Sequence, residues 1–403
     1  MRNRVLSFKS EPSRDLDSGL RKKLRPGFTR LTRLVTLYSS SSRTVARGRY
    51  SLTVYGSFSA VYSLAMSHQA KATTKARVFS GVQPSNDLHL GNYLGALKQW
   101  AAHQHETENI FCVVDLHALT LPEDIDPAVL KENTRRVAAL YFAAGLDPER
   151  NTVFIQSHVH EHAEAAWILN CTTPLGWLER MTAFKSKSQG RESVGTGLLD
   201  YPVLQAADIL LYNTDEVPVG EDQRQHIELT RDIAVRFNNL FGEVFTLPKA
   251  VIPKAGARVM GFDDPEVKMS KSIARGKSGH AVNLLDDERT IKKTVMASVT
   301  DSERETRFEH ASPGVKNLLE LYEILTSESR EDIEAKFEGQ GYGFLKKELL
   351  GAVLDTLRPV QTRYHEMMAE RAALEEVLAR GAEAARTVAA DTLAKMKAAT
   401  GLG

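Results

Sequence analysis

A strand, a Pro-Ser-Asn turn and the start of a helix follow one another between residues 77 and 100. The run 77–82 is apolar with strand composition, and the run 93–100 is typical of the first turns of a helix. In this order, the free N–H groups and the positive end of the helix dipole face any anion at the turn. The stretch therefore predicts a phosphate site. An ordinary capped helix with a surface histidine is the alternative.

Three residues in this stretch suit a nucleotide. Gly91 lets a phosphate approach the backbone closely. His89 can donate a hydrogen bond to a phosphoryl oxygen, and Asn92 offers an amide at the start of the helix.

A basic segment, Lys268-Met269-Ser270-Lys271-Ser272, stands far downstream and leads into a stretch with glycines at 276 and 279. Two ammonium groups on such a loop can neutralise the charge that develops when a phosphoryl centre is attacked. Taken alone, the segment could also be a basic solvated loop.

Together the two segments resemble the signature motifs of the class I aminoacyl-tRNA synthetases. Residues 89–92 (HLGN) are similar to the "HIGH" motif, with Asn92 in place of its second histidine, and residues 268–272 form a complete "KMSKS" loop. Within that family the chain most resembles the tryptophanyl branch. The closer resemblance runs from about residue 76 to the C-terminus and rests on the segments 79–85, 91–93, 114–118, 180–182, 206–208 and 217–223.

The resemblance implies an α/β fold, with a Rossmann-like doubly wound parallel sheet over 76–275 and an all-helical, anticodon-binding domain over 276–403. It implies that ATP converts L-tryptophan to tryptophanyl-adenylate plus diphosphate, and that the 3′ end of tRNA(Trp) then takes the aminoacyl group. It also implies Mg²⁺ held mainly by the nucleotide, a homodimer, and a cytoplasmic enzyme with no membrane part.

The resemblance also assigns the nucleotide contacts. His89, Asn92, Lys268 and Lys271 would be the catalytic groups on the phosphates. The remaining ATP-binding residues would be Gln83, Pro84, Ser85, Gly91, Lys187, Gly220, Glu221, Asp222, Val259, Met269, Ser270 and Ser272. Asp222 would accept from ribose hydroxyls, cap the following helix, or do both. Lys187 would reach the triphosphate unless it belongs to a solvated basic loop.

Asp208 is a single acid in the apolar segment 206–211. A carboxylate is costly to bury there unless a donor partners it, and an indole N–H is a suitable donor. The resemblance gives Asp208 this role in tryptophan selection, with a structural or helix-capping acid as the alternative. The expected tryptophan site comprises Phe79, Gln83, His117, Tyr201, Gln205, Asp208, Val217 and Val219.

Three other functions stay open from the sequence. Tyr201, Gln205 and Asp208 also have the spacing by which tyrosyl-tRNA synthetases bind their substrate, and Gln205 stands where many tryptophanyl enzymes have an apolar residue. A nucleotidylyltransferase on the same fold would not need the helical domain. A non-catalytic RNA-binding protein would not need the intact phosphate motifs.

Local signals place several elements. Strands are expected at 77–82, 109–114 and 152–156. A helix should begin after Asp126, with Pro127 at its first position, and end at Gly145. The apolar face of this helix is expected to comprise Val129, Val137, Leu140 and Tyr141. Helical stripes cover 315–325 and 350–360, one helix is expected to end at Gly381, and another to span 382–399.

Residues 1–75 differ from the rest in charge. They carry 15 Lys and Arg against three acids, which leaves 37 basic and 48 acidic residues in 76–403 from totals of 52 and 51. We expect this segment to be disordered. It is an organelle transit peptide, an upstream stretch before a true start at Met66, or a basic nucleic-acid arm. The first of these would place the enzyme in a mitochondrial or plastid matrix.

Metal and disulfide chemistry have little support in the sequence. Only Cys112 and Cys171 occur, which excludes a disulfide framework and a four-cysteine metal site. His158, His160 and His162 lie close in sequence but do not share one helical face, and we expect no metal site there.

Overall fold

The structure is a computed structural model that describes residues 75–84, 88–252, 259–270 and 279–403. The predictions for residues 1–74, Ser85, Lys271 and Ser272 lie outside the described residues. Within the described ranges, no helix is long and apolar enough to cross a membrane.

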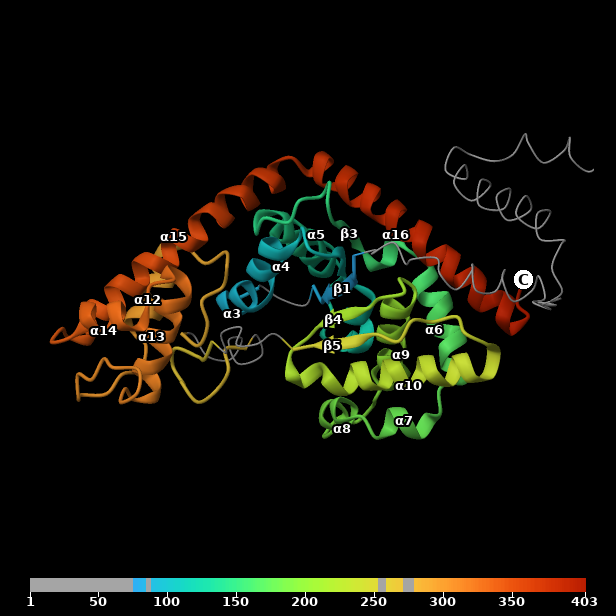
Figure 1. Cartoon of the computed structure of the whole chain (residues 1–403), viewed down its shortest axis with the longest axis horizontal. Coiled ribbons are helices and arrows are strands. Elements are labelled where there is room, and N and C mark those ends of the chain that lie inside the picture. The colour runs from blue at the N-terminus through green and yellow to red at the C-terminus, as the bar shows by residue number, and fades with distance from the viewer. Residues whose placement is uncertain (1–74, 85–87, 253–258, 271–278) are drawn as a thin grey trace, which may run out of the picture. The chain divides into compact units, whose positions relative to one another are not determined.

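Five parallel strands form the centre of the fold, in the order β3-β2-β1-β4-β5 (Figure 1). Their bounds are Arg77–Val82, Glu108–Val113, Thr152–Ile155, Glu216–Pro218 and Lys249–Val251 for β1 to β5. The three predicted strands are confirmed to within a residue at each end. From β1, the strands β2 and β3 follow on one side of the sheet, and β4 and β5 follow on the other. In such sheets, ligands lie beyond the carboxyl ends of the strands at the point where the strand order changes sides, here between β1 and β4.

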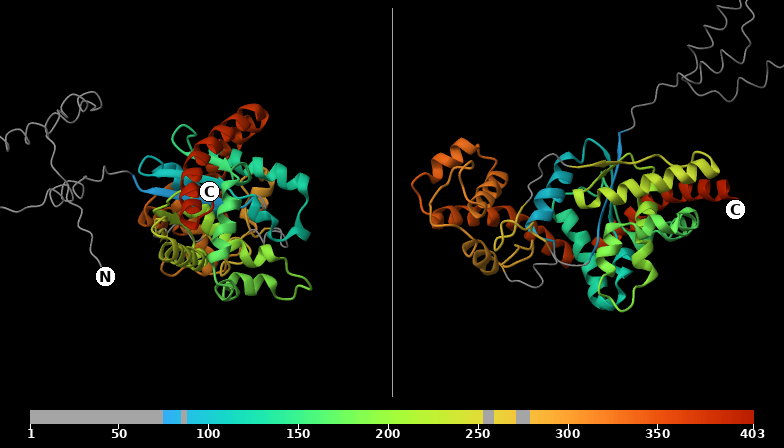
Figure 2. Two further views of the ribbon diagram at one scale, coloured as in Figure 1. Left: turned by 90° about the vertical axis from the view of Figure 1, so that its right-hand side faces the viewer. Right: turned by 90° about the horizontal axis from the view of Figure 1, so that it is seen from below.

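Helices cover both faces of the sheet (Figures 1 and 2). One core contains Phe111 and Val113 of β2 together with helix α5 (Pro127–Ala143). The other contains Ile110 and Cys112 of β2 together with helices α6 (Glu161–Thr172), α9 (Thr196–Leu210) and α10 (Arg224–Phe241). Alternate residues of one strand thus enter opposite cores, because successive side chains of a strand point to opposite faces. Burial on both faces explains why the strands are apolar runs without alternation.

The helical elements around the sheet follow the strands in sequence. They are α3 (Leu90–Asn92), η2 (Tyr93–Leu97), α4 (Lys98–His103), η3 (Leu116–Thr120), η4 (Pro122–Asp124), α5 (Pro127–Ala143), η5 (Gln156–His158), α6 (Glu161–Thr172), α7 (Leu175–Glu179), α8 (Thr182–Ser188), α9 (Thr196–Leu210), η6 (Glu221–Gln223) and α10 (Arg224–Phe241). The C-terminal part is helical, as predicted. It contains α12 (Glu288–Met296), α13 (Pro313–Thr326), α14 (Arg330–Phe337), α15 (Tyr342–Ala369) and α16 (Arg371–Thr400).

Helix α5 confirms the predicted capping signals. The Asp126 side chain accepts from the backbone N–H groups of Ala128 and Val129, and Pro127 is the first helical residue. Gly145 follows the helix with a φ of 108°, a conformation that glycine adopts without steric cost. The predicted apolar face was wrong at Val129, whose side chain is 53% exposed because it lies in the first turn, ahead of the buried stretch.

The last helix corrects another prediction. Gly381 does not end a helix, because α16 continues through it from Arg371 to Thr400. A Cβ at position 381 would collide with the backbone carbonyl of Val153 in β3, so glycine allows the helix to lie directly on the edge strand. Figure 1 shows α16 running from the end of α15 along the sheet and α6.

Candidate active site

The predicted phosphate turn is built around a reciprocal cap. Asn92 donates its backbone N–H to His89 Nδ1 (3.3 Å), and His89 donates its backbone N–H to Asn92 Oδ1 (3.1 Å). This pair fixes both side chains at the start of the helical segment 90–103. Because Nδ1 accepts, a neutral His89 ring carries its proton on Nε2 and can donate there. The same argument leaves the Asn92 Nδ2 amide as the donor that this residue offers. His89 is buried, so the alternative of a surface histidine was wrong.

The structure brings the two signature motifs together. The backbone N–H of Leu90 donates to Val282 O (2.8 Å), and Leu284 N–H donates to Leu88 O (2.8 Å), so the segment that follows the lysine loop pairs with the phosphate turn. A Cβ at Gly91 would lie 3.6 Å from Val259 Cβ. Residues 91 and 259 are therefore direct neighbours, as expected for two residues that contact the same nucleotide.

The base of the lysine loop is firmly anchored. Met269 N–H donates to Val259 O (3.0 Å), and Met269 is buried in the core while Lys268 is exposed. Beyond the loop, His280 Nδ1 lies 2.5 Å from Asp263 Oδ1, and the His280 ring is fully buried. These contacts hold the backbone of Lys268 next to the phosphate turn, with its side chain in solvent.

A second group of side chains meets at the carboxyl ends of the strands. Gln83 follows β1, His117 follows β2 and Gln156 follows β3. Gln83 Nε2 donates to His117 O (2.9 Å), which connects the phosphate turn to this group. His117 and Gln156 share a partner, the acid Asp208 of helix α9, which is 1% exposed.

Asp208 accepts three hydrogen bonds from described residues. Gln156 Nε2 (2.6 Å) and His162 Nδ1 (2.6 Å) contact its Oδ1, and His117 Nε2 (2.7 Å) contacts its Oδ2. Burial alone would raise the pKa of the Asp208 carboxyl, but His117 and His162 reverse that effect and hold the pKa well below its usual range. Asp208 is therefore an ionised carboxylate at neutral pH. It is not the cap of α9, because the N-cap of that helix is Gly195.

Tyr201 lies at the same end of the sheet, about two turns before Asp208 in α9. Its hydroxyl lies 2.9 Å from His226 Nε2, and the Lys187 Nζ lies 4.9 Å from the centre of its ring. Burial raises the pKa of Tyr201 to about 12 and lowers the pKa of the Lys187 ammonium. Burial, helped by the charge of Lys187, also lowers the pKa of His226 to about 4. Tyr201 therefore keeps its proton at neutral pH, and His226 stays neutral.

The loop after β4 supplies the remaining predicted nucleotide residues. Gly220 leaves room for Asp222, because a Cβ at position 220 would lie 2.7 Å from Asp222 Oδ1. Asp222 is exposed and does not cap α10, whose N-cap is Gln223, so that alternative was wrong. The exposed Glu221 carboxylate pairs with Arg224 (2.6 Å).

The apolar residues of the predicted tryptophan site differ in their surroundings. Phe79 is buried and stacks on Tyr212 at a ring distance of 5.6 Å, so it packs in the core. Val217 is buried, whereas Val219 is half-buried and donates its backbone N–H to Val251 O (3.0 Å). Gln205 is half-buried in α9.

Comparison with known proteins decides the family. A family model described as "tRNA synthetases class I (W and Y)" matches residues 71–358. The chain is 54% identical over 327 residues to a tryptophan–tRNA ligase of Caldanaerobacter subterraneus subsp. tengcongensis, covering 81% of this chain and 98% of the relative. It is 50% identical over 330 residues to the tryptophan–tRNA ligase of Bacillus subtilis, covering 82% and 98%. The chain belongs to the tryptophanyl-tRNA synthetases.

A solved structure agrees with this assignment. The tryptophanyl-tRNA synthetase from Campylobacter jejuni, complexed with ADP and tryptophan, matches with a TM-score of 0.72 and 37% identity, covering 81% of this chain and all of the other. The Rossmann-like class I fold and the tryptophanyl branch predicted from the sequence are thus confirmed. The comparisons give no support to the alternative functions.

Several residues of this synthetase site were missed in the sequence. Gln156, His162 and His226 contact Asp208 or Tyr201, yet none belongs to a segment that carried the resemblance. The only available signal was position, because Gln156 is the last residue of the strand predicted at 152–156 and strand ends converge at one edge of a parallel sheet. Among the described residues, no group of three or more His, Cys, Asp or Glu is placed to hold a metal ion.

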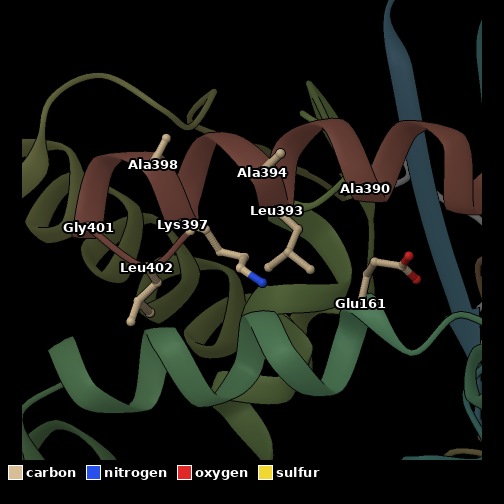
Figure 3. Close-up of a pocket in the computed structure, with 9 residues that line it drawn as sticks. Glu161, Ala390, Leu393, Ala394, Lys397, Ala398, Gly401 and Leu402 are labelled. Carbon is tan, nitrogen blue, oxygen red and sulfur yellow. The ribbon is translucent and has the colours of Figure 1, made fainter.

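A cavity of about 460 Å³ lies apart from this synthetase site (Figure 3). It is lined by α16 residues such as Leu393 and Lys397, by Leu402, and by Glu161 at the start of α6. None of the predicted site residues lines it. Lys397 bridges the two helices through an ion pair with Glu164 (2.8 Å).

Proposed function

We propose that the chain activates L-tryptophan with ATP and transfers it to the 3′ end of tRNA(Trp). The observation that supports the role of individual residues is the hydrogen bonding of Asp208. This buried, ionised carboxylate has four acceptor positions, and donors from described residues fill three of them. The fourth acceptor position, on Oδ2, receives no donor from the described residues. The indole N–H of tryptophan is a donor without acceptor capacity and matches that position.

Tyr201 supports binding of the other end of the amino acid. Since neutral His226 can accept the Tyr201 proton, the phenol oxygen keeps its lone pairs for a donor. The α-ammonium group of an amino acid is such a donor. The proposed pocket is completed by Val217, Val219 and Gln205, with Phe79 in the core of the same domain. Gln83 and His117 connect the pocket to the phosphate turn.

In the first step, the tryptophan carboxylate attacks the α-phosphorus of ATP and diphosphate leaves. This substitution needs no nucleophilic side chain, so catalysis consists of positioning and charge stabilisation. His89 Nε2–H and the Asn92 amide offer neutral donors at the turn, and Lys268 with Lys271 offer positive charge. The proposed ATP contacts also include Gln83, Pro84, Ser85, Gly91, Lys187, Gly220, Glu221, Asp222, Val259, Met269, Ser270 and Ser272.

The ATP enters with Mg²⁺, which phosphate oxygens hold well. Lys187 lies over Tyr201, on the tryptophan side of the proposed site. We therefore propose that it acts where the amino-acid carboxylate meets the α-phosphate. In the second step, the 3′-terminal ribose of tRNA(Trp) takes the aminoacyl group, and the helical region 276–403 contacts the anticodon stem.

We further propose a homodimer in the cytoplasm. Large apolar side chains are exposed on α6, α7 and α10, namely Trp167, Leu175 and Leu240, and we assign them to the contact between the two subunits. Sedimentation of the purified chain at micromolar concentration measures the assembly state.

A chain that starts at Met66 should activate tryptophan like the full chain, because every proposed site residue lies beyond residue 76. A mature N-terminus within residues 1–75 would instead favour a mitochondrial or plastid matrix.

The direct test is amino-acid-dependent exchange of diphosphate into ATP, measured with each of the twenty amino acids, followed by charging of tRNA(Trp). We expect exchange with tryptophan and formation of tryptophanyl-tRNA. Exchange without charging would favour a nucleotidylyltransferase. Absence of exchange with every amino acid would contradict the proposal.

A further inference from the structure

A buried row of polar side chains continues behind Asp208, away from the proposed substrate. His162 lies on α6 and Tyr212 follows α9, and both are 0% exposed. His162 Nδ1 lies 2.6 Å from Asp208 Oδ1, and His162 Nε2 lies 2.8 Å from the Tyr212 hydroxyl. Burying polar side chains away from solvent costs desolvation free energy. Each contact in the row must therefore pair a hydrogen-bond donor with an acceptor.

Hydrogen-bond chemistry fixes the direction of each contact. A carboxylate only accepts, so His162 Nδ1 must carry a proton. Burial raises the pKa of the Tyr212 hydroxyl far above its ordinary value, so Tyr212 keeps its proton and can donate to Nε2 of a neutral ring. In a neutral His162 ring, a Tyr212 hydroxyl that donates to Nε2 thereby favours the tautomer that donates to Asp208. A second residue thus determines the ring proton that Asp208 meets.

The same chemistry fixes which oxygen of Asp208 can meet a substrate. Gln156 and His162 together fill both acceptor positions of Oδ1. Gln156 cannot turn its amide around without losing a bond, because its Oε1 accepts from Leu116 N–H (3.0 Å). On Oδ2, His117 fills one position and leaves one. Loss of the His162 donor would free Oδ1 and let the carboxylate rotate.

We propose that His162 is a positioning residue for tryptophan selection, which holds Asp208 so that Oδ2 accepts the indole N–H. Tyr212 supports it by fixing the ring proton. This inference rests on the proposed function of Asp208. It means that a side chain without contact to the substrate determines how well the site distinguishes an indole N–H from an isosteric group that cannot donate.

The test compares two polar variants of His162. His162→Asn keeps an amide nitrogen near the position of Nδ1 and so keeps the donor to Asp208. His162→Gln places its amide nitrogen near the position of Nε2 and loses that donor. Each protein is assayed by diphosphate exchange with L-tryptophan and with its benzothiophene analogue, in which sulfur replaces the indole N–H.

The selectivity ratio is kcat/KM for tryptophan divided by kcat/KM for the analogue. It should stay within about threefold of the parent value in His162→Asn and fall about tenfold or more in His162→Gln. Tyr212→Phe should lower the ratio less than His162→Gln does. A purely structural role would instead lower kcat/KM equally for both substrates and leave the selectivity ratio unchanged. It could also give the same ratio in the Asn and Gln variants. Either result overturns the inference. A parent protein without tryptophan-dependent exchange would contradict the proposed function itself.

Discussion

Gly381, in the interior of α16, lies directly against the backbone carbonyl of Val153 in the edge strand β3. Ala382, Ala385 and Ala389 continue this contact into the core beside the sheet. Small residues let the helix cover the edge of the sheet, which otherwise exposes unpaired backbone groups.

Gly381→Ala should destabilise the protein by about 1–3 kcal/mol, because the added methyl group must displace either the helix or the strand. Gly351→Ala is the matched control, since Gly351 lies in α15 and a methyl group added there would meet nothing within 4 Å. The control should be neutral or more stable by about 0.5–1 kcal/mol, because alanine favours a helix interior over glycine. Urea unfolding of both variants measures the two changes. Equal stability of both variants would contradict the close contact.

The burial of His226 predicts a pH dependence of stability. The pKa of His226 falls from an ordinary 6.5 to about 4 in the folded chain. Between these values the unfolded chain binds a proton that the folded chain does not bind, so the free energy of unfolding decreases as pH falls through this window. The decrease assigned to this residue is about 3 kcal/mol in total.

His226→Gln removes the titrating group and should flatten the profile between pH 6.5 and about 4. Urea unfolding of the parent and the variant at intervals of pH measures the difference. Parallel profiles would mean that the pKa of His226 is the same in the folded and the unfolded chain, which contradicts the prediction.

Local signals explain what the sequence predicted well. The start of α5 was predictable because Asp126 caps its own helix and Pro127 fits the first turn. The strands were predictable because burial on both faces makes them apolar throughout. The meaning of Gly381 was not predictable, because its contact with Val153 joins residues far apart in the chain.

The site shows the same division. Asp208 could be singled out because an acid within an apolar segment is unusual. Its partners Gln156 and His162 come from the end of β3 and from α6, and only the sheet order brings them together. The roles assigned to individual residues stay predictions.

The lysine loop should act on the chemical step. Lys268→Ala should slow single-turnover adenylate formation about a hundredfold, because its charge is needed most in the transition state. The dissociation constant of tryptophan without ATP should barely change. Lys292→Ala, which removes an exposed lysine of α12, is the control and should change neither quantity. Weaker tryptophan binding at an unchanged chemical rate would contradict the phosphate role, and Lys271→Ala should behave like Lys268→Ala.

The central claim is that Asp208 selects tryptophan. Its most direct test is kcat/KM of diphosphate exchange for tryptophan, tyrosine and phenylalanine in the parent chain and in Asp208→Ala. The parent should use tryptophan far better than the other two, and the variant should lose about 1–3 kcal/mol of that preference, the cost of leaving a polar group unpaired. Equal exchange with tyrosine in the parent, or an unchanged preference in the variant, would contradict the account.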